Sequence, residues 1–138
     1  MILFVASNPS RLNLDSNVPF KGSKSEKNFN EWAARISPLG NHEVMNVLDN
    51  VTEDNRPLTK AEIEEGVFGI CERLKDGGIT KVVTLGKSAQ LAIEMSQSIV
   101  GPIDYYALPH PSPRNRFLNN KEQVEAVLEE CEKWVVRV

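Results

Sequence analysis

Short apolar runs alternate along this chain with longer segments of mixed character. Each run is continuous rather than alternating, which is typical of parallel strands that are buried on both faces of a sheet. Polar residues, proline or glycine end every run, so each has the length of a single strand. The pattern predicts four strands, over 2–6, 44–48, 81–85 and 103–108.

The segments between the runs carry apolar residues at three- and four-residue spacing, which predicts helices with one buried face. Thr59, with Glu62 three residues later, forms the sequence of a capping box. Ser23 or Ser25 could cap the helix before it. The predicted helices are one carrying Phe29, Trp32, Ala33 and Ile36, one from Thr59 to Gly77, a short one after Gly86, and one over about 120–134.

Strands that alternate with helices indicate parallel strands joined by right-handed crossovers. The fold class predicted is α/β, a three-layer α/β/α sandwich around a four-stranded, mainly parallel sheet, with residues 1–138 as a single domain. Polar turns follow Ala6, Leu85 and Leu108. These turns should meet at the carboxyl edge of the sheet, where open α/β sheets bind ligands.

Composition narrows the class of protein without deciding the function. Among 138 residues, 41% are hydrophobic and 25% charged, as in ordinary soluble domains. No apolar run is long enough to cross a bilayer, and the first residues lack the charged region of a signal peptide. Cys71 and Cys131 occupy apolar helical positions, which favours buried thiols. We therefore expect a cytoplasmic monomer with no membrane partner; the net charge of −3 gives no general attraction to nucleic acid.

The segment 108–116, LPHPSPRNR, concentrates the candidate chemistry. Its three prolines fix the backbone directly after a predicted strand. His110, Ser112, Arg114 and Arg116 then offer an imidazole, a hydroxyl and two guanidinium groups, which together suit a phosphate-bearing ligand. The alternative is a proline-stiffened loop that only leads into the last helix.

Five segments of the chain resemble motifs of the uracil-DNA glycosylase superfamily, and they occur in the same order as in that family. ASNPS at 6–10 is similar to its first active-site motif, and HPSP at 110–113 to its second. VPFKGSKS at 18–25, the stretch 44–66 and ITKVVTLGKSA at 79–89 resemble the thermostable branch of that superfamily. Asn8 stands where the mismatch-specific and single-strand-selective branches carry asparagine.

The chain departs from the family pattern at three points. Ala6 and Ser10 replace the glycines that usually begin and end the first motif, and Ser7 replaces the glutamate of the thermostable branch. That branch holds an iron–sulfur cluster on four cysteines, whereas this chain has two. We therefore expect a minimal member that needs no cofactor and no metal.

The resemblance implies a role for each matching residue. His110 would donate a hydrogen bond to the departing base, and Asn8 would orient the attacking water. Phe20 would stack on the extruded base, Asn46 would read its edge, and Ser7 would complete the base-binding group. Other residues would bind DNA phosphates or act as a wedge, a side chain that fills the space left by the extruded base. These residues are Ser112, Arg114, Asn115, Arg116 and Lys21, with Lys24 as a further cation. The alternatives are a loop aromatic packed on the core for Phe20 and structural roles for the two asparagines.

The function implied is that of a monofunctional DNA N-glycosylase. It would hydrolyse the bond to uracil, or to a related damaged or modified pyrimidine, after flipping the nucleotide out of DNA. One alternative is a catalytically weak homologue that binds DNA or a modified base. The other is a hydrolase of small nucleosides or nucleotides.

Overall fold

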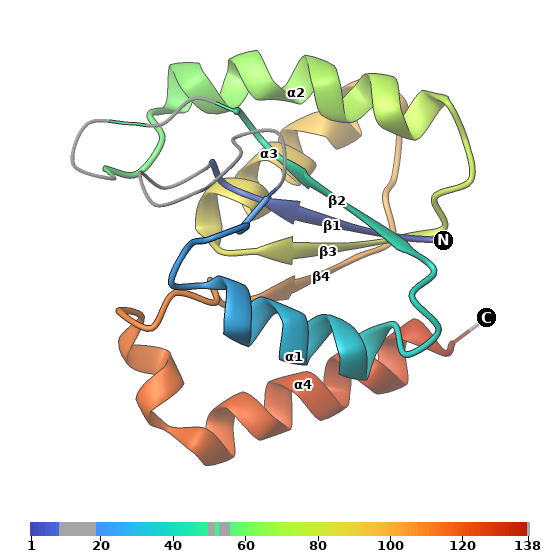
Figure 1. The fold of residues 1–138 in the computed structure, drawn as a ribbon. Coiled ribbons are helices and arrows are strands. Elements are labelled where there is room, and N and C mark those ends of the chain that lie inside the picture. Colours follow the sequence, from blue (N-terminus) through green and yellow to red (C-terminus); the bar gives the residue numbers. More distant parts are fainter. Residues whose placement is uncertain (9–18, 50–51, 53–55, 138) are drawn as a thin grey trace.

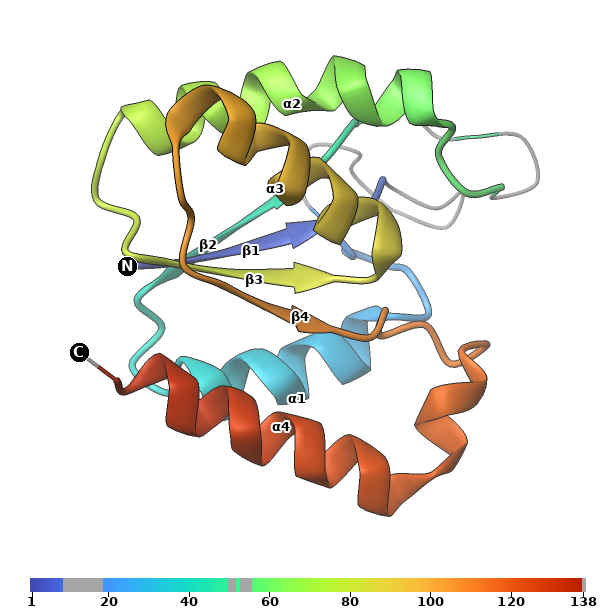
Figure 2. The same ribbon diagram turned by 180° about the vertical axis from the view of Figure 1, so that it is seen from behind.

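The computed structural model describes residues 1–8, 19–49, 52 and 56–137, and it shows a sheet covered by helices on both faces (Figures 1 and 2). The sheet has four strands in the order β2-β1-β3-β4, and all the neighbouring pairs are parallel. In chain order the elements are β1 (Ile2–Ala6), α1 (Glu26–Ile36), β2 (His42–Asn46), α2 (Lys60–Lys75), β3 (Lys81–Leu85), α3 (Lys87–Val100), β4 (Tyr105–Leu108), the 3₁₀ helix η2 (Arg116–Asn119) and α4 (Lys121–Val135).

The alternation of side chains along β1 divides the core into two layers. Ile2, Phe4 and Ala6 pack against α1 and α4, whereas Leu3 and Val5 pack against α2 and α3. Every residue of β1 is buried, which explains its continuous apolar run. The predicted three-layer α/β/α sandwich around a four-stranded parallel sheet is confirmed.

Three predicted elements need correction. The fourth strand begins at Tyr105 rather than at Ile103. The second strand runs from His42 to Asn46 rather than over 44–48, so Asn46 ends the strand instead of occupying its middle. The helix after Gly86 is not short, because it continues for 14 residues. Its polar Ser96 is fully buried and donates to the carbonyl of Ala92 at 2.7 Å, so a hydroxyl is accommodated inside the core.

Two local predictions are confirmed, the capping box of α2 and the buried thiols. Thr59 accepts a hydrogen bond from the amide of Glu62, whose side chain accepts one from the amide of Thr59, so the capping box is present. Cys71 and Cys131 are buried free thiols in the two different core layers, one on each side of the sheet. In the described part of the chain, no helix is both long enough and apolar enough to span a bilayer.

Candidate active site

The strand order creates a crevice between β1 and β3. The chain leaves β1 toward α1 on one face of the sheet, and it leaves β3 toward α3 on the other (Figures 1 and 2). At such a switch point the two connections diverge and leave room for a ligand beyond the carboxyl ends of the strands. The predicted turns after Ala6, Leu85 and Leu108 do meet at this edge.

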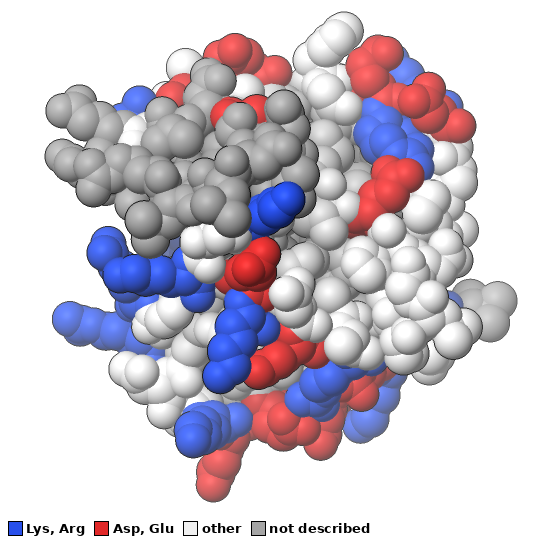
Figure 3. Space-filling view, viewed as in Figure 1, with Lys and Arg blue, Asp and Glu red and all other residues white. Residues whose placement is uncertain are grey.

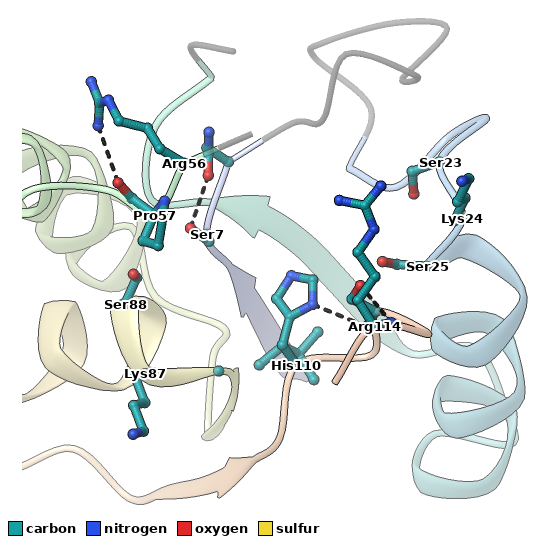
Figure 4. Close-up of a pocket in the computed structure, with 14 residues that line it drawn as sticks. Ser7, Ser23, Lys24, Ser25, Arg56, Pro57, Lys87, Ser88, His110 and Arg114 are labelled. Atoms are coloured by element: carbon teal, nitrogen blue, oxygen red, sulfur yellow. Dashed lines mark hydrogen bonds between the residues drawn. The ribbon is translucent and has the colours of Figure 1, made fainter. Parts of the chain in front are cut away.

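A hollow of about 470 Å³ lies at this edge (Figure 4). Four of its lining residues are cations and five are serines, and none of the described residues that line it is acidic. Its lining consists of Ser7, Asn8, Ser23, Lys24, Ser25, Arg56, Pro57, Leu85, Gly86, Lys87, Ser88, His110, Ser112 and Arg114. Hydroxyls, amides and cations without carboxylates suit an anionic ligand.

His110 projects into this hollow from the loop after β4 (Figure 4). The backbone amide of Ser112 donates to its Nδ1 at 3.0 Å. Because a backbone amide can only donate, Nδ1 carries no proton, and the proton of the neutral ring must be on Nε2. Burial lowers the pKa of His110 below its usual 6.5, which favours this neutral form.

Gly86 allows the loop that carries His110 to approach β3 closely. Its φ of 95° lies in the left-handed region, which glycine tolerates. A methyl group at this position would come within 3.2 Å of the His110 Cβ atom. The glycine that ends β3 is therefore required both by the turn and by the histidine beside it.

Asn8 and Ser7 line the side of the hollow formed by the turn after β1. The hydroxyl of Ser7 donates to Asn8 Oδ1 at 2.9 Å, which fixes the position of the amide oxygen (Figure 4). The other residues of the first motif, Pro9 and Ser10, lie outside the described residues.

Phe20 lies beside the hollow rather than in its lining. Its ring stacks on Phe29 with centroids 4.7 Å apart and meets the His110 ring edge-on at 6.2 Å. Only 7% of Phe20 is exposed, and its φ of 68° is unusual for a bulky residue. Phe20 therefore packs on the core through Phe29 and also lies next to His110.

Asn46 also lies behind the lining, paired in register with Ala6. It is 7% exposed, and its Nδ2 finds no hydrogen-bond partner in the described part of the chain. Alternation along β2 places it on the same face of the sheet as Val44, which is the face that Phe20 covers. A buried amide donor without a partner costs free energy unless a ligand satisfies it.

The proposed phosphate and wedge residues separate into three groups. Ser112 and Arg114 line the hollow, where the Ser112 hydroxyl accepts from the amide of Arg114 at 3.3 Å. Lys21 and Arg116 are exposed and outside the lining. Asn115 is engaged within its own loop, because its Nδ2 donates to the carbonyl of His110 and its Oδ1 accepts from the amide of Phe117.

A model of the uracil DNA glycosylase superfamily matches residues 1–132. The chain belongs to this superfamily. No curated protein matches the chain. Superfamily membership indicates, in broad terms, a hydrolase of DNA repair with glycosylase activity.

Sequence reasoning gave no site role to several residues that line the hollow. Ser25 precedes α1 but makes no side-chain cap, and it is 7% exposed with its side chain directed to the hollow (Figure 4). Lys87 and Ser88 begin α3, whose N-cap Gly86 also lacks a capping side chain. Neither α1 nor α3 therefore has a side-chain cap on the amides of its first turn.

Arg56 and Pro57 bring the loop before α2 to the same hollow. Arg56 donates to Glu62 at 2.6 Å, and Glu62 also accepts from the amide of Thr59. The hydrogen bond from Arg56, followed by that from Thr59, lowers the pKa of Glu62 to about 2. The capping box of α2 therefore also fixes a cation at the rim of the hollow.

Proposed function

We propose that this protein is a DNA glycosylase that removes uracil, or a related damaged or modified pyrimidine, from DNA. The observation that carries the proposal is the hydrogen bond from Ser112 that determines the tautomer of His110. The amide of Ser112 occupies Nδ1, so a neutral ring has its only N–H, on Nε2, free for a ligand. Such a donor suits a leaving group that becomes anionic.

In the proposed reaction, water attacks C1′ of the extruded nucleotide while the bond from C1′ to the base nitrogen breaks. The electron pair of that bond passes to the base, and the N–H at Nε2 of His110 stabilises the negative charge on the pyrimidine O2. The water loses a proton to solvent once it has bonded to C1′, and solvent returns a proton to the base, so the products are the C1′ hydroxyl and the neutral base. Asn8 holds the water through Oδ1, since an amide positions a water molecule but is too weak a base to deprotonate it. Burial keeps His110 neutral, so its role is that of a hydrogen-bond donor.

Base recognition would fall to Asn46 and Phe20. The unpartnered Nδ2 of Asn46 would donate to O4 of uracil, and Oδ1 would accept from N3–H. Cytosine presents the opposite donor and acceptor pattern at that edge, so an amide of fixed orientation rejects it. Phe20, in edge contact with His110, would supply the stacking surface.

The lining of the hollow supports DNA as the substrate rather than a free nucleoside. Lys24 and Arg114 lie on one side of the hollow, and Arg56 and Lys87 on the other (Figure 4). Phosphates flanking an extruded nucleotide would meet cations on both sides. Space-filling views show Lys and Arg side chains gathered along the edge toward which the strands point (Figure 3).

The test is cleavage of single- and double-stranded oligonucleotides that contain one uracil, read out as strand scission after alkali. We expect scission with the wild-type protein and a loss of about 10²–10³ in kcat for His110→Ala, as for removal of one donor to a developing anion. Asn8→Ala should also lower kcat. Asn30→Ala is the matched control, since Asn30 is exposed on α1.

Three outcomes would count against the proposal. Cleavage of no deaminated or 5-substituted pyrimidine, with a control glycosylase active, would refute it. Saturable DNA binding without product, unchanged by His110→Ala, would identify a binding homologue instead. Activity on free deoxyuridine but not on oligonucleotides would identify a nucleoside hydrolase.

A further inference from the structure

The loop that carries His110 has few amide hydrogen bonds to hold its backbone, one of them from the amide of Asn115 to the carbonyl of Ser112 at 3.0 Å. Pro109, Pro111 and Pro113 have no N–H, so they cannot form the amide hydrogen bonds that hold most turns together. Pro111 is nevertheless fully buried. The carbonyl groups of such a loop need donors from elsewhere, since buried backbone groups are almost always paired.

Two asparagine side chains supply those donors. Asn115 Nδ2 donates to the carbonyl of His110 at 3.1 Å, and Asn28 Nδ2 donates to the carbonyl of Pro111 at 2.9 Å. Together with the bond from the Ser112 amide to Nδ1, they hold the ring and both carbonyls of the His110–Pro111 unit. Each of the three bonds comes from a different residue.

We propose that Asn28 and Asn115 are positioning residues that set the place of the His110 ring, an inference that rests on the proposed glycosylase function. Asn28 lies on α1, one turn after Ser25 and Lys24, which line the hollow. Its hydrogen bond therefore ties the segment that would hold a phosphate to the loop that would hold the base anion. Both segments then move as one unit.

Asn115 contributes from the opposite end of the loop. Its Oδ1 caps η2 by accepting from the Phe117 amide at 3.1 Å, while its Nδ2 holds the carbonyl of His110. One side chain thus fixes the histidine to the start of the next helix. With both amide atoms engaged, Asn115 positions the loop instead of reaching into DNA.

The test compares pairs of variants that differ in whether the lost amide holds the loop. Asn28→Ala and Asn28→Asp remove the donor to Pro111, and Asn30→Ala and Asn30→Asp are the controls on the exposed side of the same helix. Asn115→Asp keeps the acceptor for Phe117 but replaces the donor to His110 with a charged carboxylate oxygen, so Asn119→Asp, an exposed residue of η2, is the control for the added charge.

We expect the Asn28 and Asn115 variants to lower kcat by about 10- to 100-fold on uracil-containing DNA, because a misplaced catalytic group costs that much. KM should change little, since the cations of the hollow are unaltered. The control variants should match the wild type. If the Asn28 variants match the Asn30 variants in kcat, the positioning role is excluded.

A second measurement does not depend on catalysis. The chain has two histidines, so NMR titration can follow His110 once His42 is assigned with a His42→Gln variant. Asn28→Ala should move the pKa of His110 up toward 6.5, because a loosened ring regains solvent, and Asn30→Ala should not. A lower melting temperature with unchanged kcat and unchanged titration would mean a structural role only, and would overturn the inference. An inactive wild type would refute the glycosylase function, while the titration would still decide the role of Asn28.

Discussion

Helix α2 contacts Val47, the residue after β2, at a glycine that has no room for a side chain. A methyl group at Gly66 would lie 2.3 Å from the carbonyl oxygen and 2.4 Å from Cγ1 of Val47. Val47 cannot easily retreat, because its amide donates to the carbonyl of Ala6 at 2.8 Å. Gly66→Ala should therefore push α2 and the end of β2 apart.

The size of the effect follows from these contacts. Ordinary contact begins near 3.4 Å, so α2 or Val47 must shift by about 1 Å. Overpacking of this kind costs about 3 kcal/mol when backbone atoms are involved. Alanine regains about 1 kcal/mol of helix propensity over glycine, which leaves a net loss of about 2 kcal/mol in the free energy of unfolding.

Gly69 provides the control on the same helix. No atom lies within 4 Å of a methyl group at Gly69, so Gly69→Ala should raise the free energy of unfolding by about 0.5–1 kcal/mol. The entropy of unfolding expected for 138 residues converts these values to a fall of about 7 °C for Gly66→Ala and a rise of about 2–3 °C for Gly69→Ala. Thermal melts followed by circular dichroism, with urea titrations for the free energies, measure both.

The difference between the two variants isolates the clash, because the gain in helix propensity is common to both. Gly66→Ala should also lower kcat/KM on uracil-containing DNA, since Val47 directly follows Asn46. Equal stability of the two alanine variants would refute the described packing of α2 on β2. A destabilised Gly66→Ala protein with full activity would show that the end of β2 is not part of base recognition.

Three further predictions concern the same edge of the sheet. Gly86→Ala should lower the free energy of unfolding by about 1–2 kcal/mol in urea titrations, because alanine is strained at a φ of 95°, and should lower kcat because its Cβ would crowd His110. The pKa of His110 lies below 6.5 in the folded protein, so between that lower pKa and pH 6.5 the unfolded protein binds a proton that the folded protein does not. The free energy of unfolding should therefore fall as the pH drops below 6.5. His110→Gln should lose this part of the pH dependence, as measured by thermal melts at a series of pH values. The pKa of Glu62 is lowered to about 2, chiefly by Arg56, so its contribution to stability is present above pH 4.5 and is lost as the pH falls toward 2. Glu62→Gln should therefore lower the melting temperature at pH 7. The difference in melting temperature from the wild type should be smaller in acid.

The central strands could be predicted from the sequence to the residue, whereas the edge strands could not. β1 and β3 are covered on both faces, so their sequences are continuous apolar runs with clear ends. β2 lies at the edge of the sheet and begins with the polar residues His42 and Glu43, which no apolar criterion would include. β4, the other edge, begins at Tyr105 rather than Ile103.

The site could be predicted where a motif follows a strand directly, and it was missed where loops from distant parts of the chain converge. Asn8 and His110 follow β1 and β4 within two residues, so placing the strands places them. Arg56 and Lys87 reach the hollow only because β2 and β3 both lie next to β1, which brings the starts of α2 and α3 to the same edge of the sheet. Ser25 has the residue type of a cap, and only coordinates show that its hydroxyl does not cap the helix.

The overall charge of the chain is a poor guide to its partner, because the structure separates the two signs. The net charge is −3, yet the described lining of the hollow holds four cations, of which Arg56 is paired with Glu62, and no carboxylate. Several carboxylates are neutralised elsewhere: Glu125 and Glu132 pair with Arg35 between α1 and α4, and Glu43 pairs with Arg73. Exposed charges more than about 8 Å apart are largely screened at physiological salt, so a phosphate at the hollow would respond to the nearby cations rather than to the net charge. An acidic chain can therefore present a local surface suited to DNA.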